Sequence, residues 1–250
     1  MADEVLTEVR GKVLLIKLNR PEAMNAFNQA QSDGLEAAVS RLNDDDDLTI
    51  GVLTGSEKAF SAGMDLKAFA KGESMDALGR FFRNGAEKPL IAAVERFALA
   101  GGLEAALACD LIVSAKGARF GIPEVSVGLF AAGGAMLRLP QRLPYGVAME
   151  MALTADPISA ERAHEYGLVT RLAEPGQAVD VAMELAGRIA KNAPLGVAAS
   201  KKMLAATQGR TDEEFWEAQG PVMAKVWTSE DAKEGPAAFA QKREPNWSGA

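Results

Sequence analysis

Short apolar runs alternate with amphipathic stretches along the first half of the chain. Runs at 5–9 and 13–18 flank Gly11-Lys12, and this arrangement predicts a β-hairpin. Later apolar runs have the length of strands in the interior of a sheet and lie at 49–54, 90–94 and 111–114. Apolar residues spaced three and four apart predict helices between these runs, over 28–43, 75–86 and 102–108. Alternating strands and helices predict an α/β layered fold.

The pattern changes at about Gly133, after which amphipathic helical patterns follow one another. They predict helices over 135–141, 146–153, 159–166 and 178–190, and beyond Pro194 over 195–207, 213–225 and 230–242. We therefore expect an α/β core over 1–193 and a helical region over 194–250. The sequence has no Walker-type or GxGxxG fingerprint, so it offers no support for a nucleotide cofactor.

Composition and charge narrow the classes of function. Hydrophobic residues make up 48% and charged residues 24% of the 250 positions, as is typical of a globular chain. The balance of 27 basic and 34 acidic residues gives 27 − 34 = −7, which disfavours nucleic acid as a partner. The most apolar stretch, Phe97 to Val113, is interrupted by Glu104 and Asp110 and is too short to span a membrane.

Single copies of histidine and cysteine narrow the chemistry further. With His164 and Cys109 alone, a zinc site built on several His or Cys ligands is excluded, and a nucleophile–His arrangement would have to use His164. Proton transfer near neutral pH is therefore expected from carboxylates or lysines with shifted pKa values. Cys109 has no partner for an internal disulfide, which favours a reducing compartment and a cytoplasmic location.

Two turns rich in small residues lead from predicted strands into predicted helices. One contains Ala62-Gly63-Met64-Asp65-Leu66, and the other contains Gly101-Gly102. Small residues let a ligand approach the backbone, and the first N–H groups of a helix are unpaired. Two such turns that face one point would form an oxyanion hole. For each turn alone a purely structural role is favoured, because glycine is common in turns between strands and helices.

Glu104 and Glu124 are the candidate acid–base groups. Glu104 begins an otherwise apolar helix, and apolar residues follow Glu124. A carboxyl group in apolar surroundings has a raised pKa and exchanges protons near neutral pH. The alternative is that Glu104 complements a helix dipole and that Glu124 ends a loop, and composition alone favours this alternative.

These segments, in this order, resemble the enoyl-CoA hydratase/isomerase (crotonase) superfamily. The resemblance is carried by Asn19-Arg20-Pro21, Ala59-Phe60-Ser61-Ala62-Gly63-Met64-Asp65-Leu66, Gly101-Gly102-Leu103-Glu104, Phe120-Gly121-Ile122-Pro123-Glu124 and Arg138-Leu139-Pro140. The pattern continues through Ala160–Val169 and Ser200-Lys201, so it spans essentially the whole chain. It implies a core of ββα units wound into a spiral, with C-terminal helices that pack the chain into a homotrimer or a hexameric dimer of trimers.

The resemblance also implies roles for individual residues. Backbone N–H groups of Ala62 and Gly101 would bind the thioester oxygen, and Glu104 and Glu124 would activate one water. Isomerases of this family often keep only the second glutamate, so having both favours hydration or dehydration. The substrate would line up along residues on both sides of the oxyanion hole: Ala62, Gly63, Met64, Asp65, Leu66, Gly101, Leu129 and Phe130.

The function expected from the resemblance is that of an enoyl-CoA hydratase, a hydro-lyase of fatty acid metabolism. The substrate would be an α,β-unsaturated acyl-CoA, whose CoA is part of the substrate, with no metal or other cofactor. Other chemistries of the superfamily remain open: double-bond isomerisation, carnitinyl-CoA-type dehydration, decarboxylation, thioester hydrolysis, and a non-catalytic binding role. Many members have Pro where this chain has Ala131, so the resemblance does not define the length or shape of the acyl group. Arg20, Lys67 and Lys71 are candidates to meet the CoA phosphates.

Overall fold

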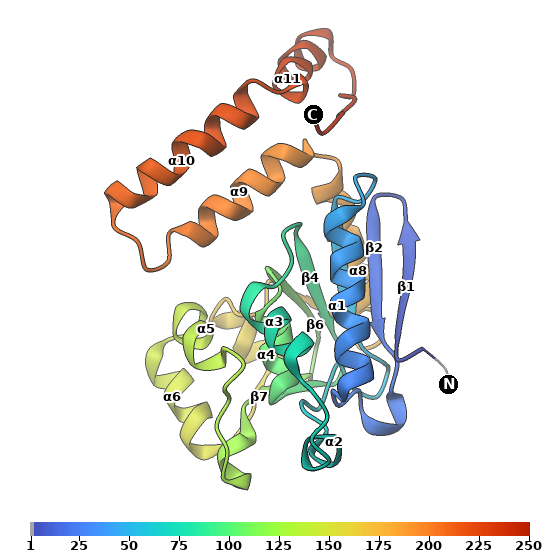
Figure 1. Ribbon diagram of the computed structural model, residues 1–250, viewed down its shortest axis with the longest axis vertical. Helices are drawn as coiled ribbons and strands as arrows, with labels where there is room; N and C mark the ends of the chain where they lie inside the picture. The colour runs from blue at the N-terminus through green and yellow to red at the C-terminus, as the bar shows by residue number, and fades with distance from the viewer. Residues whose placement is uncertain (1–2) are drawn as a thin grey trace.

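The computed structural model describes residues 3–250 and is built around a six-stranded sheet (Figure 1). The strand order is β1-β2-β3-β4-β6-β9. The strands are β1 (Val5–Arg10), β2 (Val13–Leu18), β3 (Ile50–Thr54), β4 (Leu90–Val94), β6 (Leu111–Ala115) and β9 (Arg171–Ala173). β1 and β2 form the predicted antiparallel hairpin, and the other neighbours pair in parallel. The predicted α/β layered core is confirmed.

A second, three-stranded sheet is formed by β5 (Phe97–Leu99), β7 (Arg119–Gly121) and β8 (Ile158–Ser159). The chain alternates between the two sheets: β4 of the larger sheet is followed by β5 of the smaller sheet and then by α4 (Gly101–Leu107). β6 and β7 repeat this path before the turn η2 (Pro123–Val127). An isolated bridge from Ser61 to Ala98 places the segment after β3 next to β5. These successive ββα units form the spiral that the family resemblance implies.

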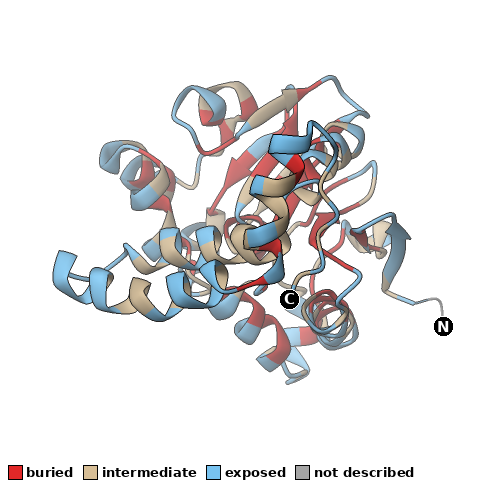
Figure 2. Cartoon of the chain, turned by 90° about the horizontal axis from the view of Figure 1, so that it is seen from above, coloured by how far each residue is buried: buried red, intermediate tan, exposed pale blue. Residues whose placement is uncertain are grey.

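Helices bury both faces of the larger sheet. Alternate residues of each strand point to opposite faces, so Leu14 and Leu53 join one apolar cluster, and Val13 and Val52 join the other. The second cluster is covered by α8 (Ala178–Ala190), and the first by α1 (Gln29–Asp44), α3 (Asp76–Asn84) and α4. Figure 2 shows the buried residues concentrated in this layered core.

Shorter helices complete the core around its second sheet and its loops. They are η1 (Pro21–Ala23), α2 (Leu66–Ala70), α5 (Ala135–Arg142), α6 (Tyr145–Thr154) and α7 (Ala160–Glu165). The helix expected after the Ala62–Leu66 turn is confirmed as α2. The sequence analysis missed β5, β7, β8 and β9, which have at most three residues each, too few for a periodic pattern of apolar side chains.

The C-terminal helices α9 (Pro194–Ala206), α10 (Asp212–Trp227) and α11 (Glu230–Gln241) extend away from the core (Figure 1). The helices predicted beyond Pro194 are confirmed, whereas the division of the chain at 193/194 stays a prediction. None of the residues described in α9 and α10 is buried, although α10 carries Trp216 and Trp227. Within the described residues, no helix has both the length and the apolar character needed to cross a bilayer.

Candidate active site

The two turns predicted to form an oxyanion hole lie against each other. A Cβ added to Gly101 would lie 3.6 Å from the backbone nitrogen of Met64 and 3.5 Å from the Cα of Gly63. In the other direction, a Cβ on Gly63 would lie 2.9 Å from the nitrogen of Gly101. Gly63 also has φ +100°, a conformation that favours glycine. Glycine at position 63 therefore lets the two backbone segments approach closely.

Ala62 does not have the free donor that the sequence analysis assigned to it. Its N–H donates a hydrogen bond of 3.0 Å to the carbonyl oxygen of Met24. The neighbouring N–H groups are also used, since Gly63 donates to Ser61 Oγ at 3.1 Å and Asp65 donates to the carbonyl of Phe27 at 2.8 Å. An N–H that is already paired is a poor oxyanion donor, so the assignment of Ala62 needs correction.

Met64 carries the free N–H of this segment. Among residues 3–250, its backbone N–H donates no hydrogen bond to another protein group. The N–H of Gly101 is the first of α4 and has no intrahelical acceptor, as expected at a helix N-terminus. Met64 and Gly101 thus each offer a free N–H, and the two residues lie close together.

Glu104 lies on α4, one turn after Gly101, and is buried. Its Oε1 accepts a hydrogen bond of 3.1 Å from the N–H of Ala135, at the start of α5. Burial raises the pKa of Glu104, while backbone hydrogen bonds from Ala135 and Gly133 and the positive charge of Arg138 oppose that rise. The carboxyl group is therefore held in a fixed position and holds a proton more strongly than a solvated glutamate does.

Glu124 is in the first turn of η2 and is partly buried. Its Oε2 is shielded from solvent and has no hydrogen-bond partner within the described chain. Burial raises the pKa of Glu124, and the negative charge of Glu104 raises it further. The structure therefore brings the two predicted glutamates into electrostatic contact, with one carboxylate oxygen of Glu124 left for a further partner.

Asp65 and Leu66 have different surroundings from the oxyanion turns. Asp65 is the N-cap of α2, where its Oδ1 accepts hydrogen bonds from Lys67 and Ala68. Its Oδ2 lies 3.2 Å from Arg20, and these contacts lower the pKa of Asp65 against the opposing effect of burial. Leu66 is 51% exposed at the start of α2.

Arg20 is less available for a CoA phosphate than its sequence position suggested. Its guanidinium group lies 3.2 Å from Asp65 and 3.4 Å from Glu4, and its side chain is only 14% exposed. Lys67 and Lys71, on and just after α2, are exposed. These two lysines remain the candidates for phosphate contact.

The segment predicted to meet the acyl group follows Glu124 directly. Leu129 donates a backbone hydrogen bond of 3.0 Å to the carbonyl of Glu124, which ties the two residues together. Leu129 and Phe130 have exposed side chains, while Ala131 is buried. Two apolar side chains next to one of the paired glutamates fit contact with the acyl portion of a substrate.

The sequence analysis missed Phe82 and Gly133. A Cβ on Gly133 would lie 2.3 Å from Cδ2 of Phe82 and 2.5 Å from Oε2 of Glu104. The ring of Phe82 also extends to Gly101, where its Cζ would lie 3.5 Å from an added Cβ. Gly133-Gly134 in the sequence was a signal for such a close approach, but its partner on α3 is distant along the chain.

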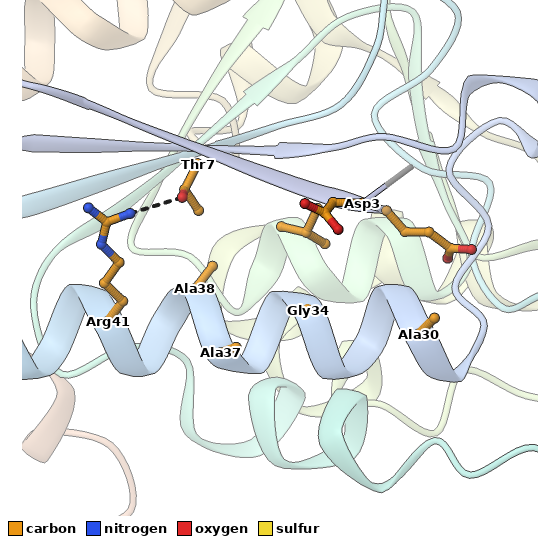
Figure 3. Close-up of a pocket in the computed structure, with 9 residues that line it drawn as sticks. Asp3, Thr7, Ala30, Gly34, Ala37, Ala38 and Arg41 are labelled. Atoms are coloured by element: carbon orange, nitrogen blue, oxygen red, sulfur yellow. Dashed lines mark hydrogen bonds between the residues drawn. The ribbon is translucent and has the colours of Figure 1, made fainter. Parts of the chain in front are cut away.

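A hollow of about 510 Å³ lies elsewhere, between β1 and α1 (Figure 3). It is lined by small residues of α1, including Ala30, Gly34 and Ala37, and is bordered by a hydrogen bond of 3.0 Å from Arg41 to Thr7. None of the predicted site residues lines this hollow.

Comparison with known proteins gives consistent matches along the chain. The family described as enoyl-CoA hydratase/isomerase matches residues 8–250. Carnitinyl-CoA dehydratases of Proteus mirabilis and Salmonella agona are 39% and 40% identical over 263 residues, and each match covers both chains completely.

Solved structures agree with this match. An enoyl-CoA hydratase from Mycobacterium tuberculosis is 51% identical with a TM-score of 0.97, covering 99% of this chain and 100% of that one. An enoyl-CoA hydratase from Mycobacterium marinum is 52% identical, also with a TM-score of 0.97 and the same coverage. Fold, motifs and similarity therefore agree: the chain belongs to the enoyl-CoA hydratase/isomerase family and is an enzyme of the crotonase superfamily.

Proposed function

We propose that this enzyme adds water across the 2,3 double bond of an α,β-unsaturated acyl-CoA thioester. The observation that carries the proposal is the pair formed by Glu104 and Glu124, whose pKa values are both raised by burial. The pair lies in the part of the fold that also holds the free N–H groups of Met64 and Gly101. Simple isomerisation would need only one of the two carboxyl groups.

In this proposal the backbone donors act on the thioester oxygen. Addition of water at C3 gives an enolate-like state in which negative charge develops on that oxygen. Fixed N–H groups at Met64 and Gly101 stabilise this charge more than they stabilise the neutral carbonyl of the substrate. The pair replaces the Ala62–Gly101 pair expected from the sequence, because the N–H of Ala62 is already paired.

The two glutamates share the proton transfers. As the oxygen of water bonds to C3, one ionised carboxylate takes a proton from that water, and the other, protonated, carboxyl group gives a proton to C2. The charge of Glu104 raises the pKa of Glu124, so the pair favours holding one proton between them. No metal or redox group enters any of these steps, and CoA acts as part of the substrate.

A second candidate function is the dehydration of carnitinyl-CoA, the reverse type of reaction. It is favoured by curated relatives with this name that are 39–40% identical along the whole chain. The same oxyanion donors and carboxyl groups serve both directions, so the difference lies in the acyl group. We expect the acyl group to be selected by Leu129, Phe130 and Ala131. Of these three, Ala131 stands where many members of the family have proline.

The proposal includes a homo-oligomer, either a trimer or a dimer of trimers. The C-terminal helices expose large apolar side chains, with Trp216 66%, Trp227 73% and Phe239 87% accessible. An isolated chain rarely leaves so much apolar surface to water. Light scattering at micromolar concentration tests this part, and a monomeric mass would refute it. A cytoplasmic location and a role in fatty acid metabolism also remain part of the proposal.

The test of the reaction uses the purified protein and a panel of acyl-CoA substrates. Loss of the enoyl-thioester absorbance of crotonyl-CoA, with a product heavier by one water, is the expected result. Carnitinyl-CoA is assayed in parallel by mass analysis of the dehydrated product. Turnover of carnitinyl-CoA alone favours the second candidate function. If crotonyl-CoA, longer enoyl-CoA homologues and carnitinyl-CoA are all left unchanged, both candidate functions are contradicted.

A further inference from the structure

Ser61 is a fully buried residue directly before the oxyanion turn. Its hydroxyl donates a hydrogen bond of 2.7 Å to the carbonyl oxygen of Asn25 and accepts one of 3.1 Å from the N–H of Gly63. Asn25 is itself buried and is held by the N–H of Arg20 and the carbonyl of Ala59, at 2.8 and 2.9 Å. The hydroxyl of Ser61 therefore links the turn to a rigid support.

The direction of the Met64 N–H is determined by the two peptides on either side of Gly63. In a trans peptide the C=O and the N–H point in opposite directions. The C=O of Gly63 accepts a hydrogen bond of 2.7 Å from the N–H of Phe27. The N–H of Met64, which belongs to the same peptide, therefore points away from Phe27.

The preceding peptide needs its own anchor. Gly63 has no Cβ, and its φ is +100°. A glycine backbone has more rotational freedom than the backbone of any other residue type. Its N–H is held by Ser61 Oγ and its C=O by Phe27. Of these two anchors, only that of Ser61 comes from a side chain.

We propose that Ser61 is a positioning residue of the oxyanion hole, which fixes Gly63 so that the Met64 N–H stays beside Gly101. The inference rests on the proposed function. Ser61 acts through the backbone of Gly63 and its hydroxyl has no role in proton transfer. Loss of the hydroxyl leaves the N–H of Gly63 without its acceptor and lets the turn relax. A shift of about 1 Å in a group that stabilises the transition state is enough to cost about 10²-fold in rate.

The test compares Ser61→Ala with a matched control, Ser114→Ala. Ser114 is also fully buried, and its hydroxyl donates to a backbone carbonyl, that of Ala115, at 3.1 Å in β6. Both changes remove a buried hydroxyl, but only one removes an anchor of the oxyanion turn. We expect kcat on the best acyl-CoA substrate to fall about 10- to 100-fold in Ser61→Ala, with KM unchanged. Ser114→Ala is expected to keep the kcat of the original protein.

A spectroscopic measurement reports the hole itself. The absorption of para-dimethylaminocinnamoyl-CoA moves to longer wavelength when its carbonyl is polarised by hydrogen-bond donors. We expect this red shift to be smaller on Ser61→Ala than on the original protein and on Ser114→Ala. A full red shift and an unchanged kcat in folded Ser61→Ala would overturn the proposal.

Two further outcomes distinguish a failure of the proposed role of Ser61 from a failure of the proposed function. If the original protein turns over none of the acyl-CoA panel and gives no red shift, the proposed function fails before Ser61 is tested. If Ser61→Ala does not fold, Ser61→Cys keeps a side chain of similar size with weaker hydrogen bonding. The kcat of Ser61→Cys is expected to be lower than that of the original protein, by less than 100-fold. An unchanged kcat and an unchanged red shift in Ser61→Cys would then overturn the proposal.

Discussion

The Cα of Gly133 lies so close to the carboxylate of Glu104 that a Cβ at this position would stand 2.5 Å from Oε2. The same Cβ would stand 2.3 Å from a ring carbon of Phe82, which is itself buried. Neither group has room to move away without repacking the core. Gly133 thus restricts the position of the Glu104 carboxylate from a segment that the sequence alone does not link to α4.

Gly133→Ala is therefore expected to displace Glu104 and to strain the packing of Phe82. Overpacking of this kind typically costs about 1–3 kcal/mol of the free energy of unfolding. We expect kcat to fall about 10- to 100-fold as the carboxylate moves. Thermal denaturation and steady-state kinetics measure the two effects. The control is Gly146→Ala on α6, where an added Cβ meets no atom within 4 Å and is expected to leave kcat unchanged.

Glu104→Gln and Glu124→Gln test the carboxyl pair directly. Glutamine keeps the size of the side chain but cannot exchange protons, so each variant is expected to lose about 10²–10⁴-fold in kcat. In the proposed reaction both groups act on one water, so the double variant should lose far less than the product of the two single losses. Glu184→Gln, an exposed position on α8, serves as the control. A single variant with the original rate would assign its glutamate a structural role.

Much of the fold could be predicted because long elements leave periodic patterns. The helix predicted over 178–190 is α8 with the same bounds, and the strand predicted over 90–94 is β4. The second sheet left no such pattern, since β8 has only two residues. Its pairing depends on contacts between distant segments, such as Ser61 with Ala98, which no local pattern records.

The candidate site was predicted to the level of segments but not of atoms. Apolar surroundings made Glu104 and Glu124 candidates and the family resemblance implied their acid–base role, while burial in the folded chain raises the pKa of both. The N–H of Ala62 is already paired, so the proposed donor moves two residues along the chain, to Met64. Whether an N–H is free depends on the carbonyl opposite it, here that of Met24, and this is a property of the folded backbone.

Gly101→Ala tests the reassigned oxyanion pair. The new Cβ would meet its nearest neighbours at 3.5 to 3.6 Å, which is ordinary van der Waals contact, so the variant is expected to fold. The methyl group would nevertheless lie beside the N–H of Met64, in the space that the thioester oxygen needs. We expect kcat to fall about 10²–10³-fold, as for the loss of an oxyanion donor. Calorimetry with free CoA is the control, because CoA binding does not use this charge, and an unchanged kcat would mean that the oxygen is held elsewhere.

The pH dependence of stability tests the environment of Glu104. Because burial raises the pKa of Glu104, the folded protein binds this proton more tightly than the unfolded chain does. The stability that this group contributes is fully present below the unfolded-state pKa and is lost as the pH rises through the raised folded-state pKa. Glu104→Gln stays neutral, so its Tm relative to the original protein should rise as the pH increases above the ordinary glutamate pKa of about 4.3. A Tm difference that stays constant or falls over this range would show that the charged carboxylate is well accommodated.

Lys201 joins the C-terminal helices to the core, and its removal tests how much this contact stabilises their attachment. From α9, its ammonium group donates to the carbonyls of Ala86 and Lys88 at 2.7 and 2.9 Å and lies 2.7 Å from Oδ2 of Asp110. Asp110 also accepts a hydrogen bond from the N–H of Leu90 in β4, so the contact reaches the central sheet.

In Lys201→Met the aliphatic part of the side chain is kept while all three polar contacts are lost. Hydrogen bonds to charged groups contribute about 1.5–3 kcal/mol each when well shielded, and this site is partly open to solvent, so we expect a total loss of about 2 kcal/mol. The expected consequence is a lower Tm and a smaller oligomer at low protein concentration, because α9 is no longer fixed against the core. Thermal denaturation and light scattering measure the two effects, with Lys202→Met, at an exposed neighbouring position, as the control. If both variants behave alike, the helices are held to the core by apolar packing and Lys201 is dispensable.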